Sequence, residues 1–188
     1  MANPFTVTVF CGAHAGRLPD YHAGASALGA GLARAGMRLV FGGGRVGLMG
    51  AVADAALAGG AAVIGVIPDF LTRLEVAHQG VGELVVTTSM HARKKLMFDL
   101  ADAFVVLPGG LGTLDETVEI LTWRQLGLHA KPVLFCDIAG TAVPLVALID
   151  AAIAAGFAPT DARDFFELHA GVAPVLARLA ALARTHPG

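Results

Sequence analysis

The stretch AFVVLPGGLGTLDE, residues 103–116, decides the fold class that this chain is expected to adopt. It begins with an apolar, β-branched run at 103–107, which is typical of a buried β-strand. The turn Pro108-Gly109-Gly110 ends that strand, and a helix is predicted over residues 113–126. A strand that passes through a glycine-rich turn into a helix is the repeating unit of α/β domains.

The same alternation continues in both directions along the chain. Strands are predicted at residues 5–11, 37–41, 61–67, 84–88, 103–107 and 132–136, and helices at 21–35, 48–58, 90–101, 113–126, 143–155 and 172–184. The strands are continuous apolar runs, which indicates burial on both faces, and helices separate nearly all of them. We therefore expect one Rossmann-like α/β domain over residues 1–188, with a doubly wound, mostly parallel sheet flanked by helices.

Composition and charge exclude several classes of protein. Of the 188 residues, 55% are hydrophobic and 15% charged, which is too apolar for intrinsic disorder. The apolar charge-free run at residues 55–68 is shorter than the roughly 20 residues that a membrane span needs, and Gly59-Gly60 interrupts it. The net charge of −2 gives no field that would hold a polyanion. We therefore expect neither a membrane nor a nucleic-acid partner.

The N-terminus and the cysteines favour a cytoplasmic location. Residues 1–4 carry no basic region followed by an apolar stretch and a cleavage site, so no export signal is visible. Cys11 and Cys136 lie in strand-like runs without CxxC spacing, and we expect them to be reduced core residues.

One glycine motif has two interpretations. The segment Gly42-Gly43-Gly44-Arg45-Val46-Gly47 fits the dinucleotide-binding spacing GxGxxG between a strand and a helix. A NAD site also needs an acidic residue at the end of the next strand, and Asp69 is poorly placed for that role. The alternative is that these glycines only form a tight turn and allow close helix packing.

The second glycine motif, residues 108–116, is more specific. A glycine-rich turn before a helix exposes backbone N–H groups and the positive end of the helix dipole, which suits a phosphate. The motif lacks the lysine of a Walker P-loop, which argues against hydrolysis of a nucleoside triphosphate. Thr113 and Glu116 also fit the spacing of a capping box, which would only start the helix. An acidic side chain beside an anion pocket nevertheless points to chemistry.

A basic cluster opens another helix. Ser89 is placed to cap it, and Arg93, Lys94 and Lys95 follow in its first turns, where cations oppose the helix dipole. We expect Arg93 to bind a ligand, and Lys94 and Lys95 to point in different directions. The histidines at 78, 91 and 129 lack paired metal-ligand spacing, so we expect polar packing or substrate contacts there and no metal.

Together these motifs resemble the LOG family, the cytokinin riboside 5′-monophosphate phosphoribohydrolases that are often labelled lysine decarboxylases. The resemblance spans roughly residues 5–148 and rests on several motifs in the same order: Cys11-Gly12, Gly42-Gly43-Gly44 to Gly47-Leu48-Met49-Gly50, Gly65-Val66-Ile67-Pro68, Glu75-Val76-Ala77-His78, Met90-His91-x-Arg93-Lys94, Pro108-Gly109-Gly110-x-Gly112-Thr113-x-x-Glu116, Thr122-Trp123-x-Gln125-Leu126-Gly127 and His129-x-Lys131-Pro132.

The resemblance implies hydrolysis of the N-glycosidic bond of N6-prenylated adenosine 5′-monophosphate, or of AMP itself, to free base and ribose 5-phosphate. It further implies a Rossmann-like homodimer that needs no cofactor. By motif position Arg93 and Glu116 are expected to be catalytic. The expected substrate contacts are Glu75, Met90, Arg93, Lys94, Gly109, Gly110, Leu111, Gly112, Thr113, Leu114, Asp115 and Thr122.

Two departures and three alternatives stay open. Ala13 stands where the family usually has serine, which removes a hydroxyl contact, and Asp115 stands where the family has glutamate. One alternative is a broader purine nucleotide nucleosidase, and another is a non-catalytic carrier of a nucleotide or of molybdenum cofactor. The third is a decarboxylase using pyridoxal phosphate on Lys94, Lys95 or Lys131, none of which lies in a recognisable cofactor setting.

Overall fold

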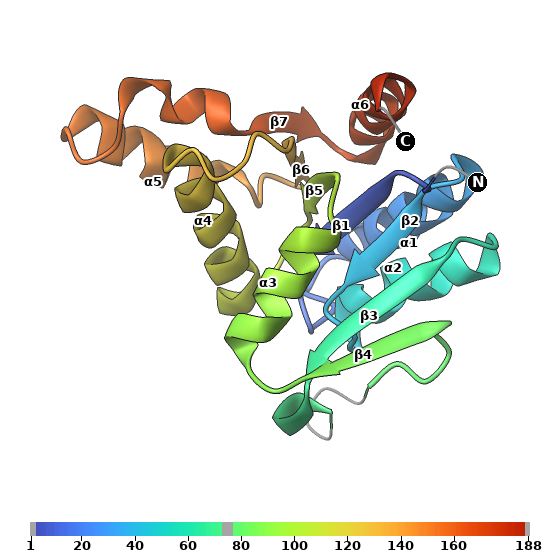
Figure 1. The fold of residues 1–188 in the computed structure, drawn as a ribbon. Helices are drawn as coiled ribbons and strands as arrows, with labels where there is room; N and C mark the ends of the chain where they lie inside the picture. The colour runs from blue at the N-terminus through green and yellow to red at the C-terminus, as the bar shows by residue number, and fades with distance from the viewer. Residues whose placement is uncertain (1–2, 73–76, 187–188) are drawn as a thin grey trace.

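The structure is a computed structural model, and it describes residues 3–72 and 77–186. A seven-stranded sheet lies at its centre, with the strand order β4-β3-β2-β1-β5-β6-β7 (Figure 1). The strands are β1 (Thr6–Phe10), β2 (Arg38–Phe41), β3 (Val63–Pro68), β4 (Glu83–Thr87), β5 (Ala103–Val106), β6 (Val133–Asp137) and β7 (Glu167–Ala170). Every neighbouring pair of these strands is parallel. The predicted Rossmann-like α/β class is therefore confirmed.

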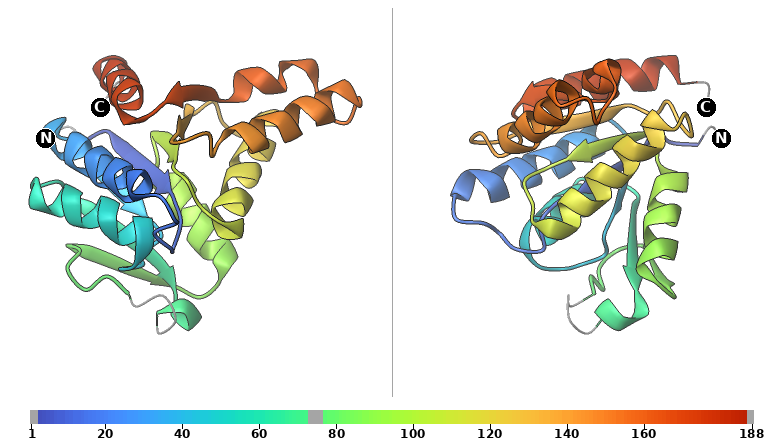
Figure 2. Two further views of the ribbon diagram at one scale, coloured as in Figure 1. Left: turned by 180° about the vertical axis from the view of Figure 1, so that it is seen from behind. Right: turned by 90° about the vertical axis from the view of Figure 1, so that its left-hand side faces the viewer.

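Helices cover both faces of the sheet, as Figures 1 and 2 show. One face carries α1 (Pro19–Arg34), α2 (Gly47–Ala58) and α6 (Val172–Thr185), and the other carries α3 (Met90–Leu100), α4 (Leu111–Gln125) and α5 (Val143–Ala154). Two short 3-10 helices, η1 (Asp69–Leu71) and η2 (Thr160–Phe165), lie in connections. Among the described residues, no helix is both long and apolar enough to cross a membrane.

Strand β1 shows how the alternation of side chains builds the two layers. Val7 and Val9 are buried in the core beneath α1 and α2. Phe10 is buried in the other core, and the Thr8 hydroxyl donates a hydrogen bond of 2.9 Å to the Met97 carbonyl of α3. Both faces of the strand are therefore buried, as predicted, and the hydrogen bond of Thr8 allows a polar side chain there.

Close packing of α1 on α2 depends on a glycine. A Cβ atom on Gly29 of α1 would lie 2.1 Å from the Val52 carbonyl oxygen of α2, so only glycine allows this approach. Figure 2 shows the two helices side by side on one face of the sheet. The close approach of these two helices therefore depends on glycine at this position.

The local structure agrees with the sequence prediction at the start of α3 and differs from it at β7 and at the start of α4. Ser89 caps α3, since its hydroxyl accepts a hydrogen bond of 3.1 Å from the amide of Ala92, as expected. Strand β7 was not predicted, because its residues Glu-Leu-His-Ala lack the apolar run that marks the other strands. The capping box is wrong: α4 begins at Leu111, with Gly110 as its N-cap and no side-chain cap. The glycine turn allows the helix to start early, so Thr113 and Glu116 lie inside it.

The topology opens a crevice between β1 and β5. From β1 the sheet grows through β2 and β3 to β4, and α3 then returns the chain to β5 on the other side of β1. Ligands bind at such a switch point, outside the carboxyl ends of the strands. The two loops there are joined directly, because the Gly12 amide donates a hydrogen bond of 3.0 Å to the Pro108 carbonyl.

Candidate active site

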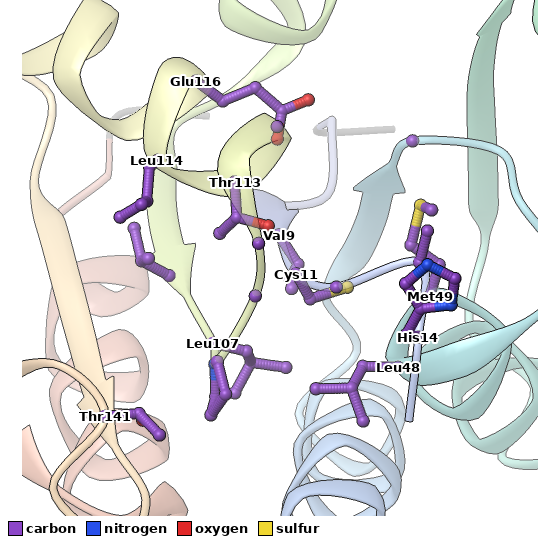
Figure 3. Close-up of a pocket in the computed structure, with 18 of the residues that line it drawn as sticks. Val9, Cys11, His14, Leu48, Met49, Leu107, Thr113, Leu114, Glu116 and Thr141 are labelled. Atoms are coloured by element: carbon purple, nitrogen blue, oxygen red, sulfur yellow. The ribbon is translucent and has the colours of Figure 1, made fainter. Parts of the chain in front are cut away.

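A cavity of about 570 Å³ lies at this switch point. Its walls come from the loop after β1, from the starts of α2, α3 and α5, and from the turn and first residues of α4. Figure 3 shows Glu116 and Thr113 of α4 on one side of Cys11, and His14 and Met49 on the other. The volume is in the range of small-molecule sites.

The glycine turn and the start of α4 form one wall. Residues 109–113 all line the cavity, and the first amides of a helix have no partner within the helix. Thr113 is buried, and a Cβ atom on Gly109 would lie 2.1 Å from its hydroxyl oxygen, so the turn requires glycine at 109. The wall thus presents backbone donors and the positive helix end, which together suit an anion.

Arg93 of α3 is buried at the carboxyl ends of β2 and β3. Its Nε donates a hydrogen bond of 3.1 Å to the Val66 carbonyl, and its Nη2 donates one of 3.0 Å to the Gly42 carbonyl. Nη1 lies 3.8 Å from the Met90 sulfur. These carbonyls compensate the lost hydration of a guanidinium that is only 5% exposed. They also fix the position of Arg93 while using two of its five N–H donors.

Glu116 lies beside Arg93 in the cavity wall. It is 7% exposed, and its Oε1 lies 4.0 Å from Arg93 Nη2. The carboxylate therefore lies in the cavity wall with a buried guanidinium next to it.

Cys11 lies in the same wall but is not a nucleophile. Burial raises the pKa of its thiol, nearby Glu116 raises it further, and Arg93 opposes the shift only in part. Cys136 also lines the cavity, and burial raises its pKa to about 12. Both thiols therefore stay protonated, in keeping with the predicted reduced core cysteines, and covalent catalysis by cysteine is disfavoured.

The cavity brings together most, but not all, of the residues that the sequence singles out. Its walls include Met90, Arg93, Gly109, Gly110, Leu111, Gly112, Thr113, Leu114 and Glu116. Within the described chain they leave out Lys94, Asp115 and Thr122. Lys94 and Asp115 form an ion pair with each other. The Thr122 hydroxyl donates a hydrogen bond of 2.8 Å to the Val118 carbonyl of its own helix. Glu75 lies outside the described residues.

Two of the three histidines that the sequence singles out make packing and polar contacts. His78 is buried, with Nε2 2.9 Å from Asp54 and its ring edge-on to Phe41. His129 Nε2 lies 2.8 Å from the Ile120 carbonyl. Among residues 3–72 and 77–186, no three His, Cys, Asp or Glu side chains are grouped closely enough to hold a metal ion.

Three cavity residues with polar side chains were not singled out individually from the sequence. His14, Tyr21 and Thr141 line the cavity from the loop after β1, the start of α1 and the segment before α5. The position of His14 just after the first strand was a usable signal, since that loop ends at the carboxyl edge of the sheet. Tyr21 and Thr141 carry no such signal, because they reach the cavity only through the packing of α1 and α5.

Similarities to known proteins bear on this site. A family model described as "Possible lysine decarboxylase" matches residues 49–179. The chain is 50% identical over 155 residues to the cytokinin riboside 5′-monophosphate phosphoribohydrolase of Rhodococcoides fascians, covering 82% of this chain and 78% of that protein. It is 41% identical over 180 residues to a probable cytokinin riboside 5′-monophosphate phosphoribohydrolase of Oryza sativa subsp. japonica, covering 96% and 81%.

A solved structure with the same fold has a different name. The molybdenum cofactor binding protein from the phototrophic bacterium Rippkaea orientalis matches with a TM-score of 0.74, over 97% of this chain and 99% of that chain. The two sequences are only 20% identical, so this likeness concerns the fold alone.

Proposed function

The chain belongs to the LOG family, whose sequence model is described as a possible lysine decarboxylase, and on that premise we propose that it is a cytokinin riboside 5′-monophosphate phosphoribohydrolase. It hydrolyses the N-glycosidic bond of N6-prenylated adenosine 5′-monophosphate and releases the free base and ribose 5-phosphate. One observation carries this proposal: Arg93, Glu116 and the start of α4 line a single cavity at the switch point of the sheet.

The start of α4 binds the 5′-phosphate. The amides of the first helical turn and the Thr113 hydroxyl donate hydrogen bonds to it, and the helix dipole favours its negative charge. This anchor holds the ribose near Glu116 and contributes binding energy remote from the bond that breaks. A nucleoside without the 5′-phosphate is therefore a poor substrate.

Glu116 performs the chemistry at C1′. As the C1′–N9 bond breaks, its electron pair passes to the purine, and the ribose carbon gains oxocarbenium character that the carboxylate stabilises. Glu116 also orients the attacking water and accepts its proton, while the hydroxide adds to C1′. That proton reaches the departed base through solvent, so the sum is one water consumed and one bond cleaved.

Arg93 keeps Glu116 ready for this role. Its hydrogen bonds to the Val66 and Gly42 carbonyls hold the guanidinium 4.0 Å from the carboxylate. A fixed neighbouring positive charge is a preorganised electrostatic group beside the carboxylate.

We infer that the enzyme is a cytoplasmic homodimer and has no nucleic-acid partner. Leu111, Leu114 and Val118 are exposed along one face of α4, a stripe of the kind that subunit contacts cover. Leu114 also lines the cavity, so a second copy bound there would lie beside the site. Light scattering coupled to size exclusion tests this: the wild type should be dimeric and Val118→Glu monomeric, and a monomeric wild type contradicts it.

Base release tests the proposed activity directly. Chromatography should detect free base from isopentenyladenosine 5′-monophosphate and from AMP with the wild type, but not with Glu116→Gln. Adenosine should react far more slowly than AMP, because it lacks the anchoring phosphate. Absence of release from both nucleotides would overturn the proposal, and equal rates on adenosine and AMP would refute the role of α4.

A further inference from the structure

Lys94 occupies an unusual position beside the catalytic pair. It follows Arg93 on α3, and its ammonium reaches across to α4, where it lies 3.0 Å from Asp115 and 3.2 Å from Glu119. The Lys94 side chain is only 15% exposed. Hydrogen bonds to the two carboxylates raise its pKa in spite of the partial burial, so the ammonium stays charged.

The order of residues links this ionic contact to the site. Arg93 and Lys94 are consecutive on α3, and Asp115 and Glu116 are consecutive on α4. Arg93 and Glu116 therefore form the buried contact at 4.0 Å in the cavity, and Lys94 and Asp115 form an ion pair outside it. A shift of α3 against α4 changes both contacts together.

The two helices are held differently at their two ends. Near their C-terminal ends, Phe98 and Trp123 pack edge to face with their ring centroids 4.7 Å apart. Toward the N-terminal ends, which carry the catalytic pair, the helices are joined by the contacts of Arg93 and Lys94 described above. Because aromatic packing fixes one end, the ionic contacts set the separation of the other.

We propose that Lys94, Asp115 and Glu119 form a brace between α3 and α4, and that Lys94 is a positioning residue that acts on the reaction through Glu116. The proposal rests on the function proposed above. It differs from the nucleotide contact that motif position implies for Lys94 and Asp115. Two carboxylates already occupy two of the three ammonium donors of Lys94, and neither Lys94 nor Asp115 lines the cavity.

Glu119 is the stronger half of the brace. Its side chain is 23% exposed whereas that of Asp115 is 57% exposed, and solvent screens the more exposed pair more strongly. Glu119→Gln should therefore reduce turnover more than Asp115→Asn does. A direct phosphate contact by Lys94 predicts the opposite sign, because removal of either carboxylate would then strengthen nucleotide binding.

The chain provides a matched control on the same helix. Lys95 also lies in α3, but it pairs with Asp99 one turn along, so Lys95→Met removes the same charge without touching α4. We expect Lys94→Met to lower kcat roughly tenfold, since small displacements of catalytic groups have effects of this order, and to leave KM nearly unchanged. Lys95→Met should match the wild type, and Lys94→Arg should restore most of kcat.

A double substitution completes the kinetic test. Lys94→Met combined with Glu119→Gln should be no slower than Lys94→Met alone, because both remove one contact. A raised KM with unchanged kcat in Lys94→Met would assign the residue to nucleotide binding and overturn the brace. An equal loss in Lys95→Met would attribute the effect to general charge, with the same consequence.

A measurement without turnover separates this proposal from the proposed function. In protein labelled with carbon-13 at glutamate carboxylates, the Glu116 resonance is assigned with Glu116→Gln. We expect it to shift in Lys94→Met and to stay in place in Lys95→Met. This result in a protein that releases no base would support the brace while the proposed function fails. An unmoved resonance in Lys94→Met would overturn the brace even in an active enzyme.

Discussion

Arg93 and Lys131 lie at opposite ends of the parallel strands, which we call the carboxyl edge and the amino edge of the sheet. Both side chains donate hydrogen bonds to backbone carbonyls. Arg93 donates to Val66 and Gly42 where β2 and β3 end, whereas Lys131, just before β6, donates 2.6 Å to the Phe98 carbonyl at the end of α3. Arg93 has a carboxylate 4.0 Å away and a cavity in front of it. Lys131 instead lies over the Phe98 ring, 4.3 Å from its centroid.

The comparison separates the chemistry of a residue from its position. Both sites partly desolvate a cation and compensate it with carbonyl oxygens. At the carboxyl edge, parallel strands end in loops that leave room for a ligand, so the fixed charge can act on a substrate. At the amino edge, aromatic packing fills the surroundings, and Lys131 closes the end of a helix. We therefore expect substitutions to affect catalysis at one edge and stability alone at the other.

Glu116→Gln should have the largest effect on activity. Glutamine keeps the size of the side chain but neither stabilises the ribosyl cation nor accepts a proton from water. We expect kcat to fall by roughly a thousandfold, within the range for loss of a general base. Base release from AMP measures this, with circular dichroism as the check on folding. A folded variant with near-wild-type turnover would remove Glu116 from the mechanism and end the contrast between the edges.

Arg93→Ala should follow, with losses in both activity and stability. The change leaves the Val66 and Gly42 carbonyls without their donor and Glu116 without its neighbouring cation. We expect about 3 kcal/mol lower free energy of unfolding, because lost hydrogen bonds to a buried charge leave unsatisfied groups. Turnover should fall roughly a hundredfold, in line with loss of one preorganised electrostatic group. Urea unfolding and kcat/KM check the two parts, and an unchanged kcat/KM contradicts the role of Arg93.

Gly42→Ala tests whether the fixed position of Arg93 matters. A Cβ atom at residue 42 would lie 2.1 Å from Arg93 Nη2, so the guanidinium must move. We expect kcat to drop roughly tenfold with little change in KM, since the substituted residue displaces Arg93 relative to Glu116. Gly29→Ala serves as a packing control away from the cavity, because its Cβ atom would also lie 2.1 Å from a neighbouring atom, the backbone carbonyl oxygen of Val52. Equal loss of kcat in both variants would show a general packing effect.

The sequence predicts the fold well because strands and helices alternate with a clear apolar pattern. Continuous apolar runs mark β1 through β6, and glycine or proline ends most of them. β7 lacks that signal, since it gains its place only by pairing with β6. The start of α4 was missed for a related reason: Thr113 and Glu116 satisfy the capping pattern, but the glycine turn starts the helix at Leu111.

The candidate site is predictable where backbone motifs define it and not where tertiary packing does. The glycine turn, Arg93 and Glu116 stand at strand ends and helix starts, so their meeting follows from the topology. The carbonyl partners of Arg93 could not be predicted, because Val66 and Gly42 come together only when β2 and β3 pair. The pairing of Lys94 with Asp115 likewise depends on how α3 packs beside α4.

Lys131→Met should have the smallest effect, and it tests the amino edge. Methionine keeps contact with the Phe98 ring but loses the hydrogen bond and the cation, so we expect about 1 kcal/mol lower free energy of unfolding and unchanged kcat/KM.

Burial lowers the pKa of Lys131 below its ordinary 10.5. Between that lowered pKa and 10.5 the unfolded chain holds a proton that the folded chain has released, so stability rises with pH in this window. The wild type should accordingly gain stability relative to Lys131→Met as the pH approaches 10.5, a difference that urea unfolding at several pH values measures. Loss of activity in a folded Lys131→Met variant would mean that the cation at the amino edge also serves the reaction, and position alone would then no longer distinguish the two edges.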